Sequence, residues 1–233
     1  MTQSKFIEEL KKINIELNSK QLNQLEKYYE MLVKYNEFMN LTGITEHDQV
    51  FLKHFYDSLT IIKAIDLNKQ ESLCDIGTGA GFPGLVLKIC FPNLKVTLLD
   101  SLNKRVEFLK DVIKELELDN IEVIHTRAEE YALKNRNKFD VTTARAVAHL
   151  SILLEYAIPM TKVGKYFIAM KANVEDEIKE IDNALKSLNT KQIEKIEFDL
   201  PIENSKRTII IFEKQQDNKK YPRKNSEIKK NRL

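Results

Sequence analysis

The stretch DIGTGAGFPG, residues 75–84, holds four of the six glycines in this chain of 233 residues. Two glycine spacings overlap in it, Gly77-x-Gly79-x-Gly81 and Gly79-x-Gly81-x-x-Gly84. Glycine lets the backbone turn through positive φ and lets a ligand approach without a Cβ in the way. The second spacing is that of dinucleotide-binding loops. The stretch therefore predicts a loop that binds a nucleotide-like ligand.

The sequence around this loop supports a nucleoside ligand. An apolar strand pattern, SLCDIG, precedes the loop, and a helical pattern over residues 81–91 follows it. The next strand pattern, KVTLLD, ends at Asp100, where a carboxylate can accept hydrogen bonds from ribose hydroxyls. The arrangement predicts an adenosine-containing ligand.

Asp75 separates two classes of such ligand. It stands two residues before Gly77, close to the amino terminus of the following helix. A carboxylate there would repel the pyrophosphate of a dinucleotide, which binds at helix amino termini. It would suit the ammonium and sulfonium groups of S-adenosylmethionine, which we predict as the cofactor. The alternative is that Asp75 only caps amides of the loop.

From about residue 71 the sequence alternates short apolar strands with amphipathic helices, which predicts a parallel sheet covered on both faces. The last two strands, about 191–199 and 206–213, have a connection too short for a crossover helix and should pair antiparallel. We predict an α/β fold with the seven-stranded, Rossmann-like sheet of S-adenosylmethionine-dependent methyltransferases over residues 67–213. The expected helices are 81–91, 103–117, 149–158 and 173–187.

Residues 1–66 form an N-terminal helical cap in this interpretation, because their apolar residues recur with a helical period. Within the cap His54, Asp57 and Ser58 share one helix face. We expect them to join the cap to the sheet domain, with substrate contact as the alternative.

The C-terminal tail, residues 214–233, carries eight Lys and Arg against Asp217 and Glu227, a net charge of +6. The whole chain has a formal charge of +2, so the first 213 residues carry −4. Such asymmetry predicts a polyanionic partner; the alternative is a tail that only aids solubility. Without apolar periodicity, the tail is expected to be a mobile arm that lies outside the glycine-loop site.

The composition of the chain also bears on its localisation, its cysteines and metal binding. The sequence contains no signal peptide and no apolar run long enough to cross a bilayer, which predicts a cytoplasmic protein without a membrane partner. The two cysteines, Cys74 and Cys90, fall in apolar patterns and are expected to be buried. The four histidines show no metal-ligand spacing, so no metal is expected.

Seven motifs are spread over the chain from about residue 20 to residue 224. They are NEFMNLTGI (36–44), KHFYDSL (53–59), DIGTGAGFPG (75–84), LLDSLNKRVEFL (98–109), RAEE (127–130), ARA (144–146) and YPRK (221–224). In these motifs the chain resembles the small-subunit ribosomal RNA methyltransferase family G, also called glucose-inhibited division protein B. The resemblance implies transfer of a methyl group from S-adenosylmethionine to N7 of a guanine in 16S ribosomal RNA, with ribosomal RNA or a ribosomal particle as partner.

The resemblance also implies cofactor contacts at Gly77, Phe82, Ala128, Glu129 and Arg145. Combined with the loop and strand-end residues, the predicted cofactor-binding set is Asp75, Gly77, Gly79, Gly81, Phe82, Asp100, Ala128, Glu129 and Arg145. The glycine and proline that usually follow YPRK in the family are missing here.

Guanine N7 presents a lone pair and has no proton to remove, so catalysis reduces to positioning the two reactants. Arg145 and Lys171 end neighbouring strands at the rim where ligands collect, and both are candidate catalytic residues. Arg145 would bind the methionine carboxylate or an RNA phosphate; the alternative is an ion pair with Glu129 or Asp140.

Two other functions remain open at this point. The glycine spacing also fits an NAD-dependent oxidoreductase, which Asp75 disfavours and for which no hydride-transfer site is evident. A non-catalytic RNA-binding module is disfavoured because the glycine loop and Asp100 are both intact.

Overall fold

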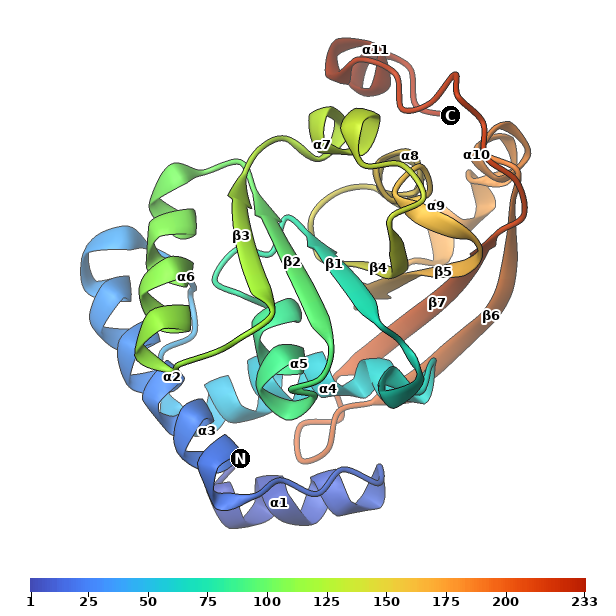
Figure 1. The fold of residues 1–233 in the computed structure, drawn as a ribbon. Helices are drawn as coiled ribbons and strands as arrows, with labels where there is room; N and C mark the ends of the chain where they lie inside the picture. The colour runs from blue at the N-terminus through green and yellow to red at the C-terminus, as the bar shows by residue number, and fades with distance from the viewer.

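The computed structural model describes residues 1–233 and centres on one seven-stranded sheet (Figure 1). The strand order is β3-β2-β1-β4-β5-β7-β6. The strands are β1 (Ser72–Ile76), β2 (Lys95–Asp100), β3 (Ile121–His125), β4 (Phe139–Arg145), β5 (Thr161–Lys171), β6 (Thr190–Asp199) and β7 (Lys206–Lys214).

Strands β1 to β5 are parallel, and β7 runs antiparallel to both β5 and β6. The connection between β6 and β7, residues 200–205, contains no helix, so the chain returns as a hairpin. The predicted seven-stranded α/β sheet with a final antiparallel pair is therefore confirmed.

Helices cover both faces of the sheet. On one face α5 (Gly84–Cys90) and α6 (Asn103–Glu115) share a hydrophobic core with the cap; on the other, α7 (Ala128–Lys134), α8 (Leu150–Ala157) and α10 (Asp182–Ser187) form a second core. The single helix expected at 173–187 is instead two short ones, α9 (Glu175–Lys179) and α10. Ile181 lies between them and is buried in the second core, which interrupts the helix.

The N-terminal cap contains helices and no strand, as predicted, and packs directly on the sheet domain. Phe6, Leu25 and Tyr28 are fully buried in the shared core, and Gln21 Nε2 donates to the carbonyls of Ile89 (3.0 Å) and Cys90 (3.1 Å) at the end of α5. The boundary at residues 66/67 stays a prediction. The cap elements are α1 (Gln3–Lys12), α2 (Ser19–Met39), α3 (His47–Val50), η1 (Phe51–Tyr56), α4 (Asp57–Leu59) and η2 (Thr60–Lys63), and the short helix η3 (Leu67–Lys69) follows them before β1.

Cys74 and Cys90 are both free and buried, as expected. No helix in the structure combines the length and the apolar character needed to cross a bilayer. No group of three or more His, Cys, Asp or Glu side chains is placed to hold a metal ion.

The C-terminal segment, residues 214–233, differs from the mobile arm expected from its composition. It leaves β7 and reaches the short helix α11 (Asn225–Lys230), which lies beside α7 and α8 in Figure 1. Lys214 and Ile228 are fully buried. A few apolar residues, Ile228 with the partly buried Tyr221 and Leu233, and a few ion pairs anchor this segment, and neither group gives a periodic signal in the sequence. We call residues 214–233 the C-terminal strap.

Candidate functional site

The glycine loop joins β1 to α5 at the carboxyl edge of the sheet. Gly77, Gly79 and Gly81 have φ values of 66°, 62° and 106°, in the left-handed region that side chains with a Cβ rarely adopt. A Cβ on Gly77 would lie 2.8 Å from a methyl group of Val147, and one on Gly81 would lie 2.5 Å from the Tyr28 hydroxyl. The turn therefore favours glycine at all three positions, and the close packing around it also requires glycine at Gly77 and Gly81.

Asp75 lies beneath the loop and is fully buried. Its Oδ2 accepts hydrogen bonds from the Thr78 hydroxyl (2.6 Å) and the Gly84 amide (2.8 Å), whereas Oδ1 is buried without a partner. Burial raises the pKa of this carboxyl to about 6, against the opposing effect of the two hydrogen bonds. Asp75 lines neither cavity described below. Asp75 thus shapes the loop through Thr78 and Gly84, and its direct contact with the cofactor's charged groups stays a prediction.

The first cavity, which we call the glycine-loop cavity, lies where β1, β2 and β3 end and has a volume of about 130 Å³. Four predicted cofactor residues line it together: Gly77, Asp100, Ala128 and Glu129. Gly79 does not line it, but its amide donates to Asp100 Oδ2 at 2.9 Å and so fixes that carboxylate.

Two carboxylates in this cavity offer hydrogen-bond acceptors. Asp100 already accepts from the amides of Gly79 and Leu102, each at 2.9 Å, and a carboxylate has further lone pairs for a ligand. Glu129 is only 5% exposed, yet its Oε1 has no hydrogen-bond partner. A buried acceptor without a partner is costly, so the cavity is built for a ligand that donates hydrogen bonds.

The second cavity, which we call the rim cavity, has a volume of about 610 Å³ and lies between the cap and the ends of β4, β5 and β7. Four cationic side chains line it: Lys53, Arg145, Lys171 and Arg207. These four cations come from four separate elements, η1, β4, β5 and β7. The sequence could not show that all four lie together.

Asp57 joins the cap to the sheet in this cavity. Its Oδ2 is 3.0 Å from Arg145 Nη1 on β4, and its Oδ1 is 3.0 Å from Arg207 Nε on β7. The expectation that this helix face joins the two parts is confirmed for Asp57 and His54. Ser58 instead turns back to the carbonyl of His54 within its own helix.

Arg145 is fixed by the cap on several sides. Besides Asp57, it donates to the carbonyl of Lys53 at 3.1 Å, and its Nη2 lies 3.3 Å from His54 Nδ1. The guanidinium also lies over the ring of Phe82, 5.1 Å from its centroid. The alternative pairing with Glu129 or Asp140 is wrong. Three of the five guanidinium N–H donors are engaged, which leaves two for a ligand.

His54 connects this network to the glycine loop. Its ring stacks on Phe82 with centroids 4.4 Å apart, and its Nε2 lies 2.9 Å from the Thr42 hydroxyl. Burial, followed by the nearby charge of Arg145, lowers the pKa of His54 to about 3. The imidazole is therefore uncharged at neutral pH. The roles of Thr42 and Arg207 were missed from sequence: Thr42 lies within the motif NEFMNLTGI, but the motif does not show its contact with His54, and Arg207 belongs to no recognised motif.

Lys171 is not the free rim cation that the sequence suggested. Its Nζ donates to the carbonyl of Ala148 (2.8 Å) and to both carboxylate oxygens of Glu177 (2.8 and 2.6 Å). These bonds use all three N–H donors of a lysine. Lys171 thus holds the loop between β4 and α8, residues 146–149, in place.

That loop separates the two cavities. Val147 belongs to the lining of both, and its side chain stands directly against Gly77. The glycine-loop cavity and the rim cavity are therefore adjacent, and Val147 is a wall that they share. Two residues of the C-terminal strap, Asn225 and Lys229, also line the glycine-loop cavity, contrary to the expectation that the strap lies outside it.

Comparison with known proteins assigns the family. The family model for "rRNA small subunit methyltransferase G" matches residues 21–206. The chain belongs to this family. A ribosomal RNA small subunit methyltransferase G from Lysinibacillus sphaericus is 49% identical, with 96% of each chain covered. One from Lachnoclostridium phytofermentans is 48% identical, covering 94% of this chain and 93% of the relative.

Solved structures agree in fold. A SAM-dependent methyltransferase from Aquifex aeolicus matches with a TM-score of 0.53 and 18% identity, covering 72% of this chain and 93% of that one. TYW2 from M. jannaschii, in complex with AdoMet, matches with a TM-score of 0.53 and 14% identity, covering 68% and 76%. The prediction of a ribosomal RNA methyltransferase, rather than an oxidoreductase, is confirmed by the family assignment.

Asp100→Ala gives a direct test of the glycine-loop cavity. We expect the affinity for S-adenosylhomocysteine to fall by about 1–3 kcal/mol, because hydrogen bonds to a charged acceptor are lost. Isothermal titration calorimetry measures this change. RNA affinity should be unaffected. A variant that lost RNA binding and kept S-adenosylhomocysteine would contradict the placement of the cavity.

Proposed function

We propose that this protein transfers the methyl group of S-adenosylmethionine to N7 of a guanine in small-subunit ribosomal RNA. The observation that carries the proposal is that the two cavities lie next to each other and share Val147 as a wall. One has the carboxylates and glycine loop of a nucleoside site, and the other has the cations of a nucleic-acid site. A methyl group can pass between their ligands only at such a junction.

The residues of the glycine-loop cavity fit adenosylmethionine. Asp100 is placed to accept from ribose hydroxyls, and the unpartnered Glu129 to accept from the adenine amino group. Gly77 leaves room where any side chain would collide with Val147. The cavity is smaller than the roughly 300–1,000 Å³ of small-molecule sites. The cofactor therefore extends past Val147, which places its methionine part toward the rim cavity and Arg145.

The rim cavity suits a nucleotide extruded from RNA. Its volume of about 610 Å³ lies within the range of ligand sites, and enzymes that modify a base take it out of the stack into such a pocket. Four cations and two carboxylates, Asp57 and Glu177, line the cavity, so phosphate binding is favoured there. Arg145 keeps two N–H donors for the methionine carboxylate or an RNA phosphate.

The chemistry at this junction requires alignment and no proton transfer. When bound, S-adenosylmethionine supplies an electrophilic methyl group on a sulfonium. The bond from N7 to carbon forms as the sulfur–carbon bond breaks, and the positive charge passes to the base. The titratable groups that face the rim cavity agree with this: Asp57 and Glu177 are bound to cations, and His54 is a very weak base.

This substrate implies further properties. Small-subunit ribosomal RNA or a ribosomal particle is the partner, and the cytoplasm is the compartment where both occur. Neither a metal nor a membrane is needed, because the lone pair of N7 reacts without activation.

The pH dependence of methyl transfer provides one test. We expect a single-turnover rate that is constant from about pH 7 to 8.5, because N7 needs no general base in that window. Asp75, with a pKa of about 6, is ionised over this range, and His54, with a pKa of about 3, is uncharged. A steep limb within this window would indicate a target atom that loses a proton.

The decisive experiment uses tritium-labelled S-adenosylmethionine with ribosomal RNA, precursor particles and small subunits from a strain that lacks the modification. Label should enter one guanine as 7-methylguanine, located by mapping of the modified base. Titration with NADH in parallel should give no binding. Label at another atom, or in large-subunit RNA alone, would overturn the proposal.

A further inference from the structure

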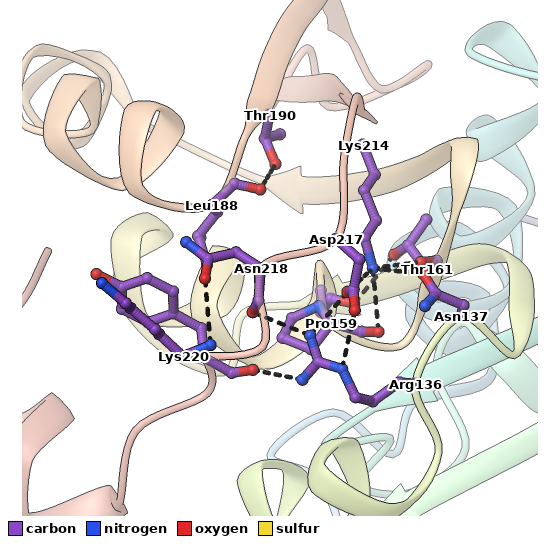
Figure 2. A network of polar contacts seen from close by, with 12 residues as sticks. Arg136, Asn137, Pro159, Thr161, Leu188, Thr190, Lys214, Asp217, Asn218 and Lys220 are labelled. Carbon is purple, nitrogen blue, oxygen red and sulfur yellow. Dashed lines mark hydrogen bonds and ion pairs between the residues drawn. The ribbon is translucent and has the colours of Figure 1, made fainter.

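The C-terminal strap is fixed to the body at two places before it reaches α11. Figure 2 shows the first, where Asp217 receives two hydrogen bonds from Arg136, from Nε at 3.2 Å and from Nη2 at 2.7 Å. Arg136 also binds the carbonyl of Asn218 at 3.0 Å, and Asn218 donates to the carbonyl of Ser187 at 2.8 Å. Residues far apart in the sequence thus converge on one turn of the strap.

Lys214 strengthens this first anchor. It is fully buried, and its Nζ binds Asn137 Oδ1 (2.7 Å) and the carbonyl of Thr161 (3.0 Å), as Figure 2 shows. Its ion pair with Asp217 is 2.8 Å long. Burial opposes the charged form of Asp217, but the hydrogen bonds from Arg136 and Lys214 outweigh it and lower its pKa to about 2. The Asp217 carboxylate of this anchor therefore stays charged throughout the physiological pH range.

The second anchor holds the strap beside the glycine-loop cavity. Glu155 on α8 is fully buried and accepts three hydrogen bonds from Arg223: from the amide at 2.8 Å, Nε at 2.9 Å and Nη2 at 2.6 Å. Two residues later α11 begins, and its only buried side chain is Ile228. A buried, bidentate ion pair fixes geometry as well as position, so α11 is delivered to a defined place.

That place is the edge of the glycine-loop cavity, where Asn225 and Lys229 join its lining. The Tyr156 hydroxyl lies 3.2 Å from Asn225 Oδ1 and donates to it. Burial, together with the nearby carboxylates of Glu129 and Glu155, raises the pKa of Tyr156 to about 12, so the hydroxyl remains a donor. Because Oδ1 of Asn225 is occupied, its Nδ2 is the group left for a ligand.

Donors on the strap thus line the same cavity as the unpartnered acceptor on α7. Glu129 Oε1 is buried without a partner, and the Lys229 ammonium has no carboxylate within ion-pair distance. Adenine suits this set of groups, because its amino group can donate to Glu129 Oε1 while its ring nitrogens can accept from the donors on the strap.

We propose that the strap is a wall of the cofactor site and that Asn225 and Lys229 donate hydrogen bonds to ring nitrogens of the bound adenine. The proposal rests on the proposed function, since it assumes that adenosine occupies the glycine-loop cavity. In this proposal Asn225 and Lys229 are cofactor-binding residues that hold the adenine in place. The strap then has a role in the site itself, in addition to its charge.

The test compares full-length variants by calorimetry with S-adenosylhomocysteine. Asn225→Ala combined with Lys229→Ala should weaken binding about 10- to 100-fold, the scale for losing one neutral and one charged hydrogen bond. Lys230→Ala removes the same charge from the same helix but does not line the cavity, so its affinity should stay within about twofold of wild type. Lys229→Arg alone keeps a charged donor at this position, so its affinity for S-adenosylhomocysteine should lie much closer to that of the wild type than to that of the double variant.

Methylthioadenosine, which lacks the amino acid part, distinguishes a contact to adenosine from a change elsewhere. The double variant should lose the same factor with this ligand as with S-adenosylhomocysteine. In the wild type, bound S-adenosylhomocysteine should also slow tryptic cleavage within α11. Equal losses in the Lys230→Ala control, or wild-type affinity in the double variant, would overturn the strap's role. If Asp100→Ala also kept wild-type affinity, the cofactor site itself would be wrong.

Discussion

Gly77→Val should abolish measurable binding of S-adenosylhomocysteine, with at least about a 100-fold loss of affinity. Gly77 has a φ of 66°, and a Cβ there would lie 2.8 and 2.9 Å from the two methyl groups of Val147. Left-handed backbone costs about 1–2 kcal/mol and overpacking a further 1–3 kcal/mol or so. Relief requires the loop or Val147 to move, and both line the cavity. Calorimetry measures the loss, at about 1.4 kcal/mol per tenfold change.

Gly164→Val is the matched control for this variant. Gly164 has a φ of 73°, so the backbone strain is similar, but no atom lies within 4 Å of an added Cβ. It lies in β5 and lines neither cavity. We expect lower stability with unchanged affinity for S-adenosylhomocysteine. Comparable losses of affinity in both variants would mean that strain, and not the cavity, explains the effect.

Asp57→Ala should lower the free energy of unfolding by about 3–5 kcal/mol, as expected when one partner of a buried ion pair is removed. Asp57 is 5% exposed, and its two oxygens balance Arg145 and Arg207. Without the carboxylate, two guanidinium groups face each other across the rim cavity. Urea denaturation followed by circular dichroism measures the change.

The origin of that loss can be checked by a second substitution. Adding Arg207→Ala to Asp57→Ala removes one of the uncompensated cations and should restore part of the stability. Glu8→Ala, which breaks exposed ion pairs with Lys5 and Lys12 on the cap, should change stability little. A loss in Asp57→Ala as small as that in Glu8→Ala would show that the join between cap and sheet does not depend on this carboxylate.

Much of the fold followed from local sequence patterns. The alternation of strands and helices, the six-residue connection of the last hairpin and the glycine loop all reflect backbone geometry over short stretches. Asp100 was found in the same way, because a parallel strand delivers its last residue to the same edge as the loop. Four predicted residues accordingly line one cavity: Gly77, Asp100, Ala128 and Glu129.

Only the tertiary structure decided which partners the charged groups have. Arg145 binds Asp57, 88 positions away, and Arg207 binds the same carboxylate from 150 positions away. The sequence could show that Lys171 ends a strand, but not that Glu177 and Ala148 use all of its donors. Ion pairs between distant elements depend on how the layers pack, and leave no periodic signal along the chain.

The C-terminal strap shows most clearly the difference between what the sequence determined and what the tertiary structure decided. Its composition determined a net charge of +6 and no apolar repeat, which predicted a mobile arm. Its position depends on charged partners contributed by other elements, the partly buried Arg136 for Asp217 and the buried Glu155 for Arg223. A buried ion pair forms only when both charges are brought together out of water, and that juxtaposition exists only in the folded chain.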